Sequence, residues 1–132
     1  MTCISEMPAH SGFIKAVAVD SSHGILITAG DRTIQLWDLV SLNNIQSFKV
    51  GIDETRALCI DEENQLLFSA GKGNAKRGGL MAWDLRKQVL MEEKEKNQDI
   101  FCIYRKDYLY YGSRDRYVHA LDLQRLEKGP AL

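Results

Sequence analysis

The chain has 132 residues, of which 45% are hydrophobic and 27% charged, as in ordinary globular proteins. This length suits one domain with a real core. Seventeen Lys and Arg against eighteen Asp and Glu give a net charge of −1, so the whole chain gives no reason to expect nucleic-acid or membrane binding. No apolar run approaches the length of a transmembrane helix, and the N-terminus lacks the charged-then-apolar plan of a signal peptide.

The cysteines give no sign of a metal or disulfide framework. Cys3, Cys59 and Cys102 are far apart and form no CxxC pair, and the three histidines stand near none of them. A zinc site needs clustered soft ligands. The pattern favours reduced core cysteines in a cytoplasmic or nuclear protein, with no metal and no cofactor.

Three segments of the chain resemble one another and close with Asp38, Asp84 and Asp122. These residues recur at intervals close to the period of roughly 40–45 residues of four-stranded propeller blades. Each segment holds short β-rich runs separated by Asp, Gly, Ser or Asn turns, which predicts antiparallel meanders in an all-β fold. The expected repeats cover approximately residues 8–49, 50–94 and 95–123, and residues 124–132 form a tail.

Individual runs predict particular strands. Ile14–Val19 is almost continuously apolar, which predicts a strand covered on both faces. Thr33–Trp37 alternates polar and apolar residues, which is typical of a strand with one wetter face. Leu85–Asn97 has good helix formers, but the repeat register places an outermost strand there, and edge strands often carry charge that prevents pairing with other chains. We favour a charged edge strand, with a helix as the alternative.

The segment endings carry a family resemblance. Leu36–Asp38 and Ala82–Asp84, with His10 ahead of the first, resemble the WD40 repeat family, whereas the third ending has Leu121 in place of the tryptophan. The resemblance covers roughly residues 3–123. It implies a partial β-propeller of three four-stranded antiparallel blades, whose strands a to d run outward from the centre. The repeat-closing residues are Trp37, Asp38, Trp83, Asp84, Leu121 and Asp122.

The resemblance also implies a structural polar network in each blade, made by a His before strand a, a Ser or Thr on strand b, an Asp in the b–c turn and the Trp of strand c. The first repeat supplies His10, Thr28, Asp31 and Trp37. Buried groups of these kinds are costly unless they satisfy one another. Gly51 and then Glu95 replace the His in the later repeats, while Asp115 keeps the turn position. These residues are structural, and no catalytic residue is expected.

The two ends of the chain match an offset that the resemblance associates with ring closure. Thr2–Met7 is interpreted as an outermost strand d contributed by the N-terminus, and the last strand c ends at Leu123. Closed propellers have about four to eight blades, and three blades leave two sheet faces in need of neighbours. We favour a piece or short isoform of a larger propeller. A six-bladed ring of two copies and an open wedge are the alternatives.

The hairpin Ala70–Gly79 contains four glycines and three cations, but it fails the spacing of a P-loop and of GxGxxG. The repeat alignment makes it an extended b–c loop, for which a solvated turn is the simplest interpretation. By resemblance, the b–c and d–a loops share one face, the usual partner surface of the family. The b–c turns carry the cations Arg32, Lys72, Lys76, Arg77, Arg114 and Arg116. Such a patch suits an acidic or phosphorylated peptide.

Other candidate sites are weaker. The repeat register places no carboxylate or nucleophile beside His23 or His119, which favours solvated side chains. Five tyrosines cluster in the third repeat, as in surfaces on which the bases of single-stranded nucleic acid stack. Ordinary packing of these side chains within the protein is the favoured interpretation.

The sequence therefore predicts a non-enzymatic protein–protein interaction scaffold that binds other proteins through the b–c and d–a loop face. The alternative is a reader of anionic ligands, namely phosphopeptide, phosphoinositide or nucleic acid, through the basic loops. Nucleic acid is the least favoured of these, because the chain is neutral overall.

Overall fold

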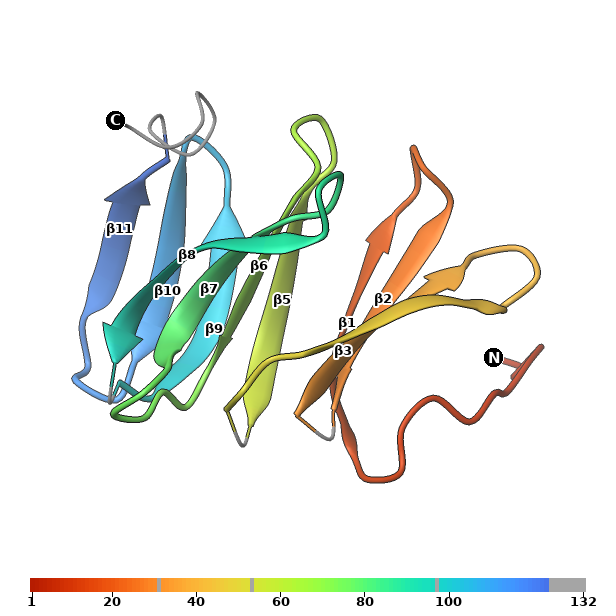
Figure 1. The fold of residues 1–132 in the computed structure, drawn as a ribbon, viewed down its shortest axis with the longest axis horizontal. Coiled ribbons are helices and arrows are strands. Elements are labelled where there is room, and N and C mark those ends of the chain that lie inside the picture. Colours follow the sequence, from red (N-terminus) through yellow and green to blue (C-terminus); the bar gives the residue numbers. More distant parts are fainter. Residues whose placement is uncertain (31, 53, 97, 124–132) are drawn as a thin grey trace.

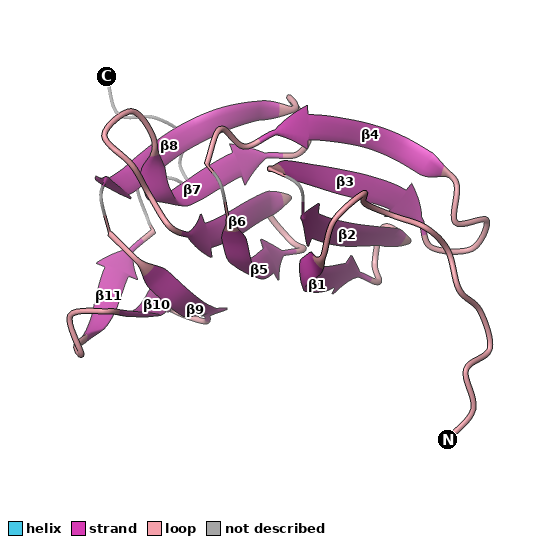
Figure 2. Ribbon diagram, turned by 90° about the horizontal axis from the view of Figure 1, so that it is seen from below, coloured by secondary structure: helices cyan, strands magenta, loops and turns pink. Residues whose placement is uncertain are grey.

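The computed structural model describes residues 1–30, 32–52, 54–96 and 98–123. These residues form β-strands, and no helix, in three antiparallel sheets that stand in a row (Figures 1 and 2). The predicted all-β fold of a partial propeller is confirmed. Within the described ranges, no helix is long and apolar enough to cross a membrane.

Each sheet is a meander in which strands that follow one another in the chain are paired. The first sheet contains β1 (Ile14–Asp20), β2 (Ile25–Gly30), β3 (Thr33–Asp38) and β4 (Asn44–Lys49). The second contains β5 (Thr55–Asp61), β6 (Leu66–Gly71), β7 (Gly78–Asp84) and β8 (Val89–Lys96). The third contains β9 (Ile100–Arg105), β10 (Tyr108–Ser113) and β11 (Val118–Asp122), and β11 is an edge strand.

The charged stretch after Trp83 is a strand, as favoured from the sequence. β8 pairs antiparallel with β7 along its length, from Asp84 opposite Val89 to Gly78 opposite Lys96. Successive side chains of a strand point to opposite faces. Leu90 therefore packs against the apolar cluster between the first and second sheets, and Met91 against the cluster between the second and third. A helix at this position would leave the edge of β7 unpaired.

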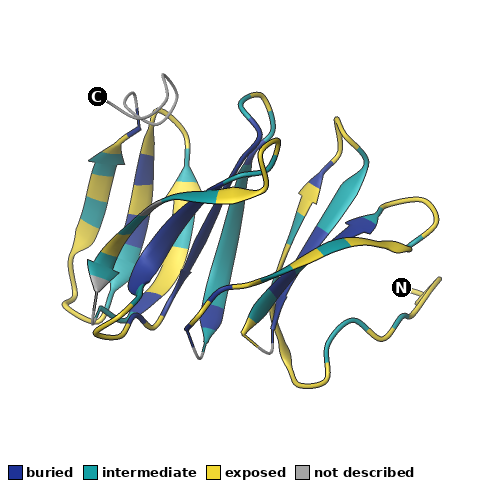
Figure 3. Ribbon diagram, in the orientation of Figure 1, coloured by how far each residue is buried: buried dark blue, intermediate teal, exposed yellow. Residues whose placement is uncertain are grey.

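The middle sheet holds the fold together because both of its faces are covered. Ile27, Leu36 and Trp83 belong to the apolar cluster between the first and second sheets. Phe68 and Leu109 belong to the cluster between the second and third. Every residue of β6 is buried, and the buried positions gather in the second sheet (Figure 3).

Strand β1 departs from the sequence prediction, which expected cover on both faces. Ala16 and Ala18 pack against the core, whereas Val17 and Val19 are exposed. The equivalent strand of the second sheet, β5, is covered on both faces, because Leu58 packs against the first apolar cluster and Cys59 against the second. Strand β1 has a neighbouring sheet on one face only. A run of apolar residues shows that a strand can be buried on both faces. It is buried on both only when a neighbouring sheet packs against each face.

The predicted outermost strand at the N-terminus is not formed, and the third sheet has three strands, not four. Residues 1–13 contain no strand, and Thr2–Glu6 are exposed. The physical reason is distance within the row, because the N-terminal segment lies beside the first sheet and the edge strand β11 lies at the opposite end (Figures 1 and 2). Three sheets do not bend far enough to bring these ends together.

The connections between strands fall on two opposite edges of the row. The β2–β3, β4–β5, β6–β7, β8–β9 and β10–β11 connections reach the lower edge in Figure 1. We define the loop edge as the described residues of these connections: 32, 50–52, 54, 72–77, 98, 99 and 114–117. All six cations proposed from the sequence lie on it.

Candidate functional site

Backbone hydrogen bonds join the segments of the loop edge to one another. The N–H of Gly73 donates to the carbonyl of Gln98 at 2.8 Å, and the N–H of Arg114 donates to the carbonyl of Asp99 at 2.9 Å. The N–H of Lys72 donates to the carbonyl of Glu54 at 3.1 Å. A surface held in this way loses little further conformational entropy when it binds a partner.

The extended β6–β7 connection is an ordered turn. The side-chain oxygen Oδ1 of Asn74 accepts hydrogen bonds from the N–H groups of Lys76 and Arg77, at 2.9 and 2.8 Å. The N–H of Asn74 donates to the carbonyl of Arg77 at 2.9 Å. Asparagine favours such turns because its short side chain imitates a backbone carbonyl. The loop therefore presents Lys76 in a defined position.

Carboxylates of the protein itself face at least three of the six cations. Nη1 of Arg77 lies 3.5 Å from Oε2 of Glu93, and Nη1 of Arg114 lies 3.9 Å from Oδ2 of Asp99. Lys72 lies close enough to Asp99 to help lower the pKa of that carboxyl. Arg32, Lys76, Arg114 and Arg116 are exposed. The basic patch is thus partly neutralised from within.

Asp99, which the sequence analysis did not single out, lies among cations of the second and third sheets. Its carboxylate accepts a hydrogen bond from Nη1 of Arg56, and this contact is the main reason why the pKa of Asp99 is lowered. Arg56 also donates to Oε2 of Glu54 at 3.1 Å. The guanidinium carbon of Arg56 lies 4.4 Å from the centroid of the Phe101 ring, in cation–π contact.

The same arrangement recurs one sheet earlier. Nζ of Lys15 lies 3.8 Å from Oε1 of Glu54. Lys15 and Arg56 occupy the bulge of β1 and of β5, where the pairing with the next strand shifts register. Their carboxylate partners stand directly before β5 and β9. Alignment of the repeats on these charges, in addition to the turn residues, would have found both pairs.

The first sheet contains a polar network centred on Thr28, which is buried. Nε2 of His10 lies 2.8 Å from Oγ1 of Thr28, and Nε1 of Trp37 donates to the same oxygen at 3.0 Å. An indole N–H only donates, so the hydroxyl of Thr28 can give its own hydrogen to the imidazole. Nδ1 of His10 lies 3.4 Å from Oγ1 of Thr33. Asp31, the fourth proposed member, lies outside the described residues.

The second sheet keeps part of this arrangement. Nε1 of Trp83 donates to Oγ of Ser69 at 2.9 Å. Gly51 stands where the first sheet has His10, and a Cβ there would lie 3.0 Å from Nε of Arg77. The guanidinium of Arg77 therefore covers the position from which an imidazole would otherwise reach inward.

The third sheet replaces the network with different chemistry. Tyr111 occupies the register position that Thr28 has in the first sheet, and it lies opposite Ile103 and His119. The hydroxyl of Tyr111 is hydrogen-bonded to Glu95. Burial, and then the hydrogen bond and charge of Glu95, raise the pKa of Tyr111 to about 12. The ring stacks on His119 with centroids 4.6 Å apart. Asp115 accepts a hydrogen bond from Oγ of Ser113 at 2.6 Å.

The repeat-closing aspartates of the first two sheets shape the turns that follow them. Oδ1 of Asp38 accepts from the N–H groups of Val40 and Ser41, and Oδ1 of Asp84 from those of Arg86 and Lys87, all within 3.0 Å. Trp37 and Trp83 are buried, and Leu121 packs against the second apolar cluster. Asp122 is an exposed residue at the end of β11.

The same repeat appears in comparison with known proteins. The sequence profile described as "WD domain, G-beta repeat" matches residues 1–38. This part of the chain therefore matches a WD40 repeat. This WD40 repeat contains β1 to β3 and the polar network around Thr28. The match supports a general role in protein interaction, since the family consists largely of non-enzymatic scaffolds.

A second comparison extends beyond the matched WD40 repeat. The chain is 32% identical over 81 residues to the CCR4-associated factor 4 homolog of Vanderwaltozyma polyspora. The similar region covers 60% of this chain. It spans 12% of the length of that relative.

Two histidines outside the WD40 network lie beside carboxylates, which the repeat register did not predict, although His23 is exposed as expected. Nδ1 of His23 lies 3.0 Å from Oδ2 of Asp20, and Nε2 of His119 lies 2.7 Å from Oδ2 of Asp115. Both carboxylates belong to the same tight turn or hairpin as their histidine, and turn geometry brings side chains together that a linear alignment separates. Among the described residues, no group of His, Cys, Asp and Glu could hold a metal ion.

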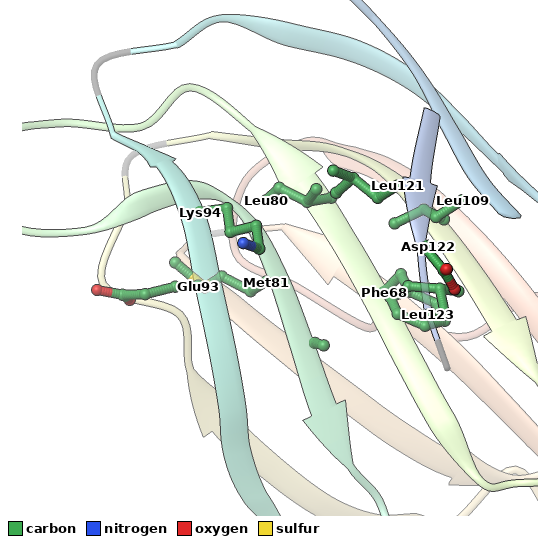
Figure 4. Close-up of a pocket in the computed structure, with 10 residues that line it drawn as sticks. Phe68, Leu80, Met81, Glu93, Lys94, Leu109, Leu121, Asp122 and Leu123 are labelled. Atoms are coloured by element: carbon green, nitrogen blue, oxygen red, sulfur yellow. The ribbon is translucent and has the colours of Figure 1, made fainter. Parts of the chain in front are cut away.

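A pocket of about 250 Å³ lies between the second and third sheets, beside the edge strand β11. Leu80 comes from the second sheet, and Leu109 and Leu121 from the third (Figure 4). Lys94 lies at one side and Asp122 at the other. Most of the lining side chains are apolar, and we assign the pocket no ligand.

Proposed function

We propose that this protein is a non-enzymatic scaffold that binds an acidic segment of a partner protein on the loop edge. The observation that carries the proposal is the gathering of exposed cations from all three sheets on one edge, in a chain whose net charge is −1. Charge that is concentrated in this way attracts oppositely charged partners and steers their approach.

Lys76, Arg114 and Arg116 are the residues to which we assign the binding. All three are exposed. Lys76 stands on the β6–β7 turn and the two arginines on the β10–β11 turn, and hydrogen bonds of Asn74 and Asp115 fix these turns. The pairing of Arg114 with Asp99 is long, at 3.9 Å, so an incoming carboxylate can compete for the guanidinium. Arg77, which Glu93 faces from within, serves to position the loop.

An acidic protein segment suits this surface because the cations are spaced along connections of successive sheets. Arginine also binds carboxylates and phosphates with two parallel hydrogen bonds, so phosphorylation of the segment would strengthen the contact. The similar Vanderwaltozyma polyspora protein is named as a CCR4-associated factor, which accords with protein binding.

Fluorescence anisotropy with labelled peptides tests the proposal. The probes are a glutamate-rich peptide, the same peptide with one phosphoserine, and a neutral peptide of equal length. We expect the acidic peptides to bind, and the triple variant Lys76→Ala, Arg114→Ala, Arg116→Ala to bind at least about tenfold more weakly, since charge-assisted hydrogen bonds contribute about 1.5–3 kcal/mol each.

The matched control removes three cations from the opposite edge, with Arg86→Ala, Lys87→Ala and Lys106→Ala. This variant has the same net charge as the first, and it should keep the affinity of the original chain. Equal weakening by the two variants would show non-specific attraction, and no binding by the original chain would refute the proposal. Tighter binding of an inositol phosphate or an oligonucleotide, with a steep salt dependence, would favour the alternative of an anionic-ligand reader.

A further inference from the structure

The face by which each sheet meets the next one is formed by apolar residues at equivalent register positions. In the first sheet, Ile27 pairs with Leu36 and Ala29 with Ile34, and these side chains are buried against the second sheet. The equivalent residues of the second sheet are buried against the third. They are Phe68, paired with Ala82, and Ala70, paired with Leu80.

The third sheet exposes this same face. Tyr110 pairs with Ala120 and Gly112 with Val118, the same register positions on β10 and β11. Val118 is 79% exposed and Tyr110 is 37% exposed, and Tyr104 and Tyr108 extend the apolar surface at 65% and 45%. A sheet face of this composition is suited to packing, since aromatic and β-branched residues provide large apolar area.

The opposite face of the first sheet is exposed in a complementary way. Val17 lies opposite Thr28, as Leu58 lies opposite Ser69 in the second sheet. Leu58 and Ile60 pack against the first apolar cluster, whereas Val17 and Val19 are 56% and 44% exposed. The row of sheets therefore ends on one side with the face that accepts a preceding sheet, and on the other with the face that accepts a following one.

The ion pairs between neighbouring sheets identify what should meet at these two ends. Lys15 and Arg56 occupy the bulges of β1 and β5 and contact the carboxylates that stand before β5 and β9. At the bulge of β9, the corresponding residue is Phe101, which is 50% exposed. Directly before β1, the corresponding residue is Phe13, which is 83% exposed. An apolar pair thus replaces the charged pair where the row ends.

We propose that two copies of this chain associate head to tail, with the outer face of the third sheet of each copy packed on the outer face of the first sheet of the other. Phe101 of one copy then contacts Phe13 of the other, as Arg56 contacts Asp99 within the chain. Two identical head-to-tail contacts close the assembly at six sheets, which is within the range of about four to eight blades of closed propellers. The proposal does not depend on the loop-edge function.

Light scattering coupled to size exclusion tests this assembly on the full chain over a range of concentrations. We expect twice the mass of one chain. Phe101→Glu or Phe13→Lys alone should give the mass of a single chain, because each substitution places a charged side chain against a phenylalanine of the other copy in both contacts of a pair. Val40→Glu, in the exposed β3–β4 connection, is the control and should keep the doubled mass.

Mixing the two variants provides the decisive measurement. In a mixed pair, one contact joins the introduced carboxylate to the introduced ammonium, and the other keeps both phenylalanines. We therefore expect the mixture of Phe101→Glu and Phe13→Lys to recover the doubled mass. The dissociation constant of the mixed pair should be at least about tenfold lower than that of either variant alone. Circular dichroism checks that each variant keeps its sheets, and Val118→Glu replaces Phe101→Glu if that variant does not fold.

Four outcomes would overturn the proposal. One is a single-chain mass for the original protein at every concentration. Another is a doubled mass for the separate variants, and a third is a mixture that stays at the single-chain mass. A mass that keeps rising with concentration would show an open array and would refute the closed pair.

Discussion

The buried carboxylate of Asp20 accepts a hydrogen bond of 2.6 Å from Nε2 of Gln65, across the boundary between the first and second sheets. The equivalent residue of the second sheet, Asp61, lies 3.1 Å from Nη2 of Arg105 in the third. An aspartate at the end of β1 and of β5 thus ties each sheet to its successor. Burial of such a group is favourable only when its partners remain in place.

Acid should therefore weaken the contact between the first two sheets. Burial alone would raise the pKa of Asp20, but hydrogen bonds, led by those of Gln65 and Ser22, outweigh it and lower the pKa from 3.8 to about 2. Since the folded-state pKa is depressed, the stabilisation is present above pH 3.8 and is lost as the pH falls from 3.8 toward 2. It amounts to about 2 kcal/mol.

Urea unfolding between pH 5 and about pH 2 measures this loss. Asp20→Asn should reduce the stability near pH 5 and flatten the decline below about pH 4. The exposed Glu6→Gln is the control and should follow the original chain. A decline that Asp20→Asn leaves unchanged would assign the acid sensitivity to other carboxylates.

Loss of the Thr28 hydroxyl should cost more than loss of the Ser69 hydroxyl. Thr28→Val removes a hydrogen-bond partner of both the Trp37 indole and the His10 imidazole, whereas Ser69→Ala removes a partner of the Trp83 indole. We expect a decrease of about 2–3 kcal/mol in the free energy of unfolding for the first and about 1–2 kcal/mol for the second. Denaturant titration measures both, with the exposed Thr2→Val as control, and equal losses would contradict the assigned role of His10.

Alkaline conditions should destabilise the third sheet through Tyr111. Its pKa is raised from 10.0 to about 12 in the folded protein, first by burial and then by Glu95. The stabilisation is complete below pH 10 and is lost as the pH rises from 10 to 12. Ultraviolet titration should show one tyrosine ionising last, and Tyr111→Phe should remove that late step. A late step that survives in this variant would belong to another tyrosine.

Gly71 should not tolerate a side chain. A Cβ there would lie 1.9 Å from the carbonyl oxygen of Glu54, a backbone atom that cannot rotate away. We expect Gly71→Ala to lower the free energy of unfolding by about 1–3 kcal/mol or more. The added methyl group would force the end of β6 away from the connection before β5. Gly24→Ala is the comparison, because a Cβ at Gly24 meets nothing within 4 Å and the cost comes from φ +65 alone. It should cost about 1 kcal/mol, and thermal unfolding measures both variants.

Local patterns predicted the strands well because alternation of side chains is a property of the strand itself. The charged stretch of β8 could be assigned from the repeat register, since Leu90 and Met91 point to opposite faces. Exposure of Val17 could not be assigned in this way, because it depends on whether another sheet lies beside β1. The N-terminal segment Thr2–Met7 has a strand-like sequence, but a strand needs an edge to pair with, and that edge lies at the other end of the row.

The site shows the same division between local and distant information. The turn positions of Lys76, Arg114 and Arg116 follow from the repeat, since hairpin turns alternate between the two edges of a meander. The pairing of Arg56 with Asp99 joins residues from different sheets. The contacts of His23 and His119 with carboxylates depend on turn geometry that an alignment of repeats does not contain.

The sequence by itself determined the class of the fold, the period of the sheets, and the placement of Trp37 and Trp83 in strands that follow a turn. It did so because alternation and turn chemistry act over a few residues. Only the tertiary structure decided which apolar faces are covered, which cations have carboxylate partners, and that Tyr111 with Glu95 takes the place of Thr28 with His10. Those properties depend on distances between sheets, and packing sets these distances only when all three sheets are in place.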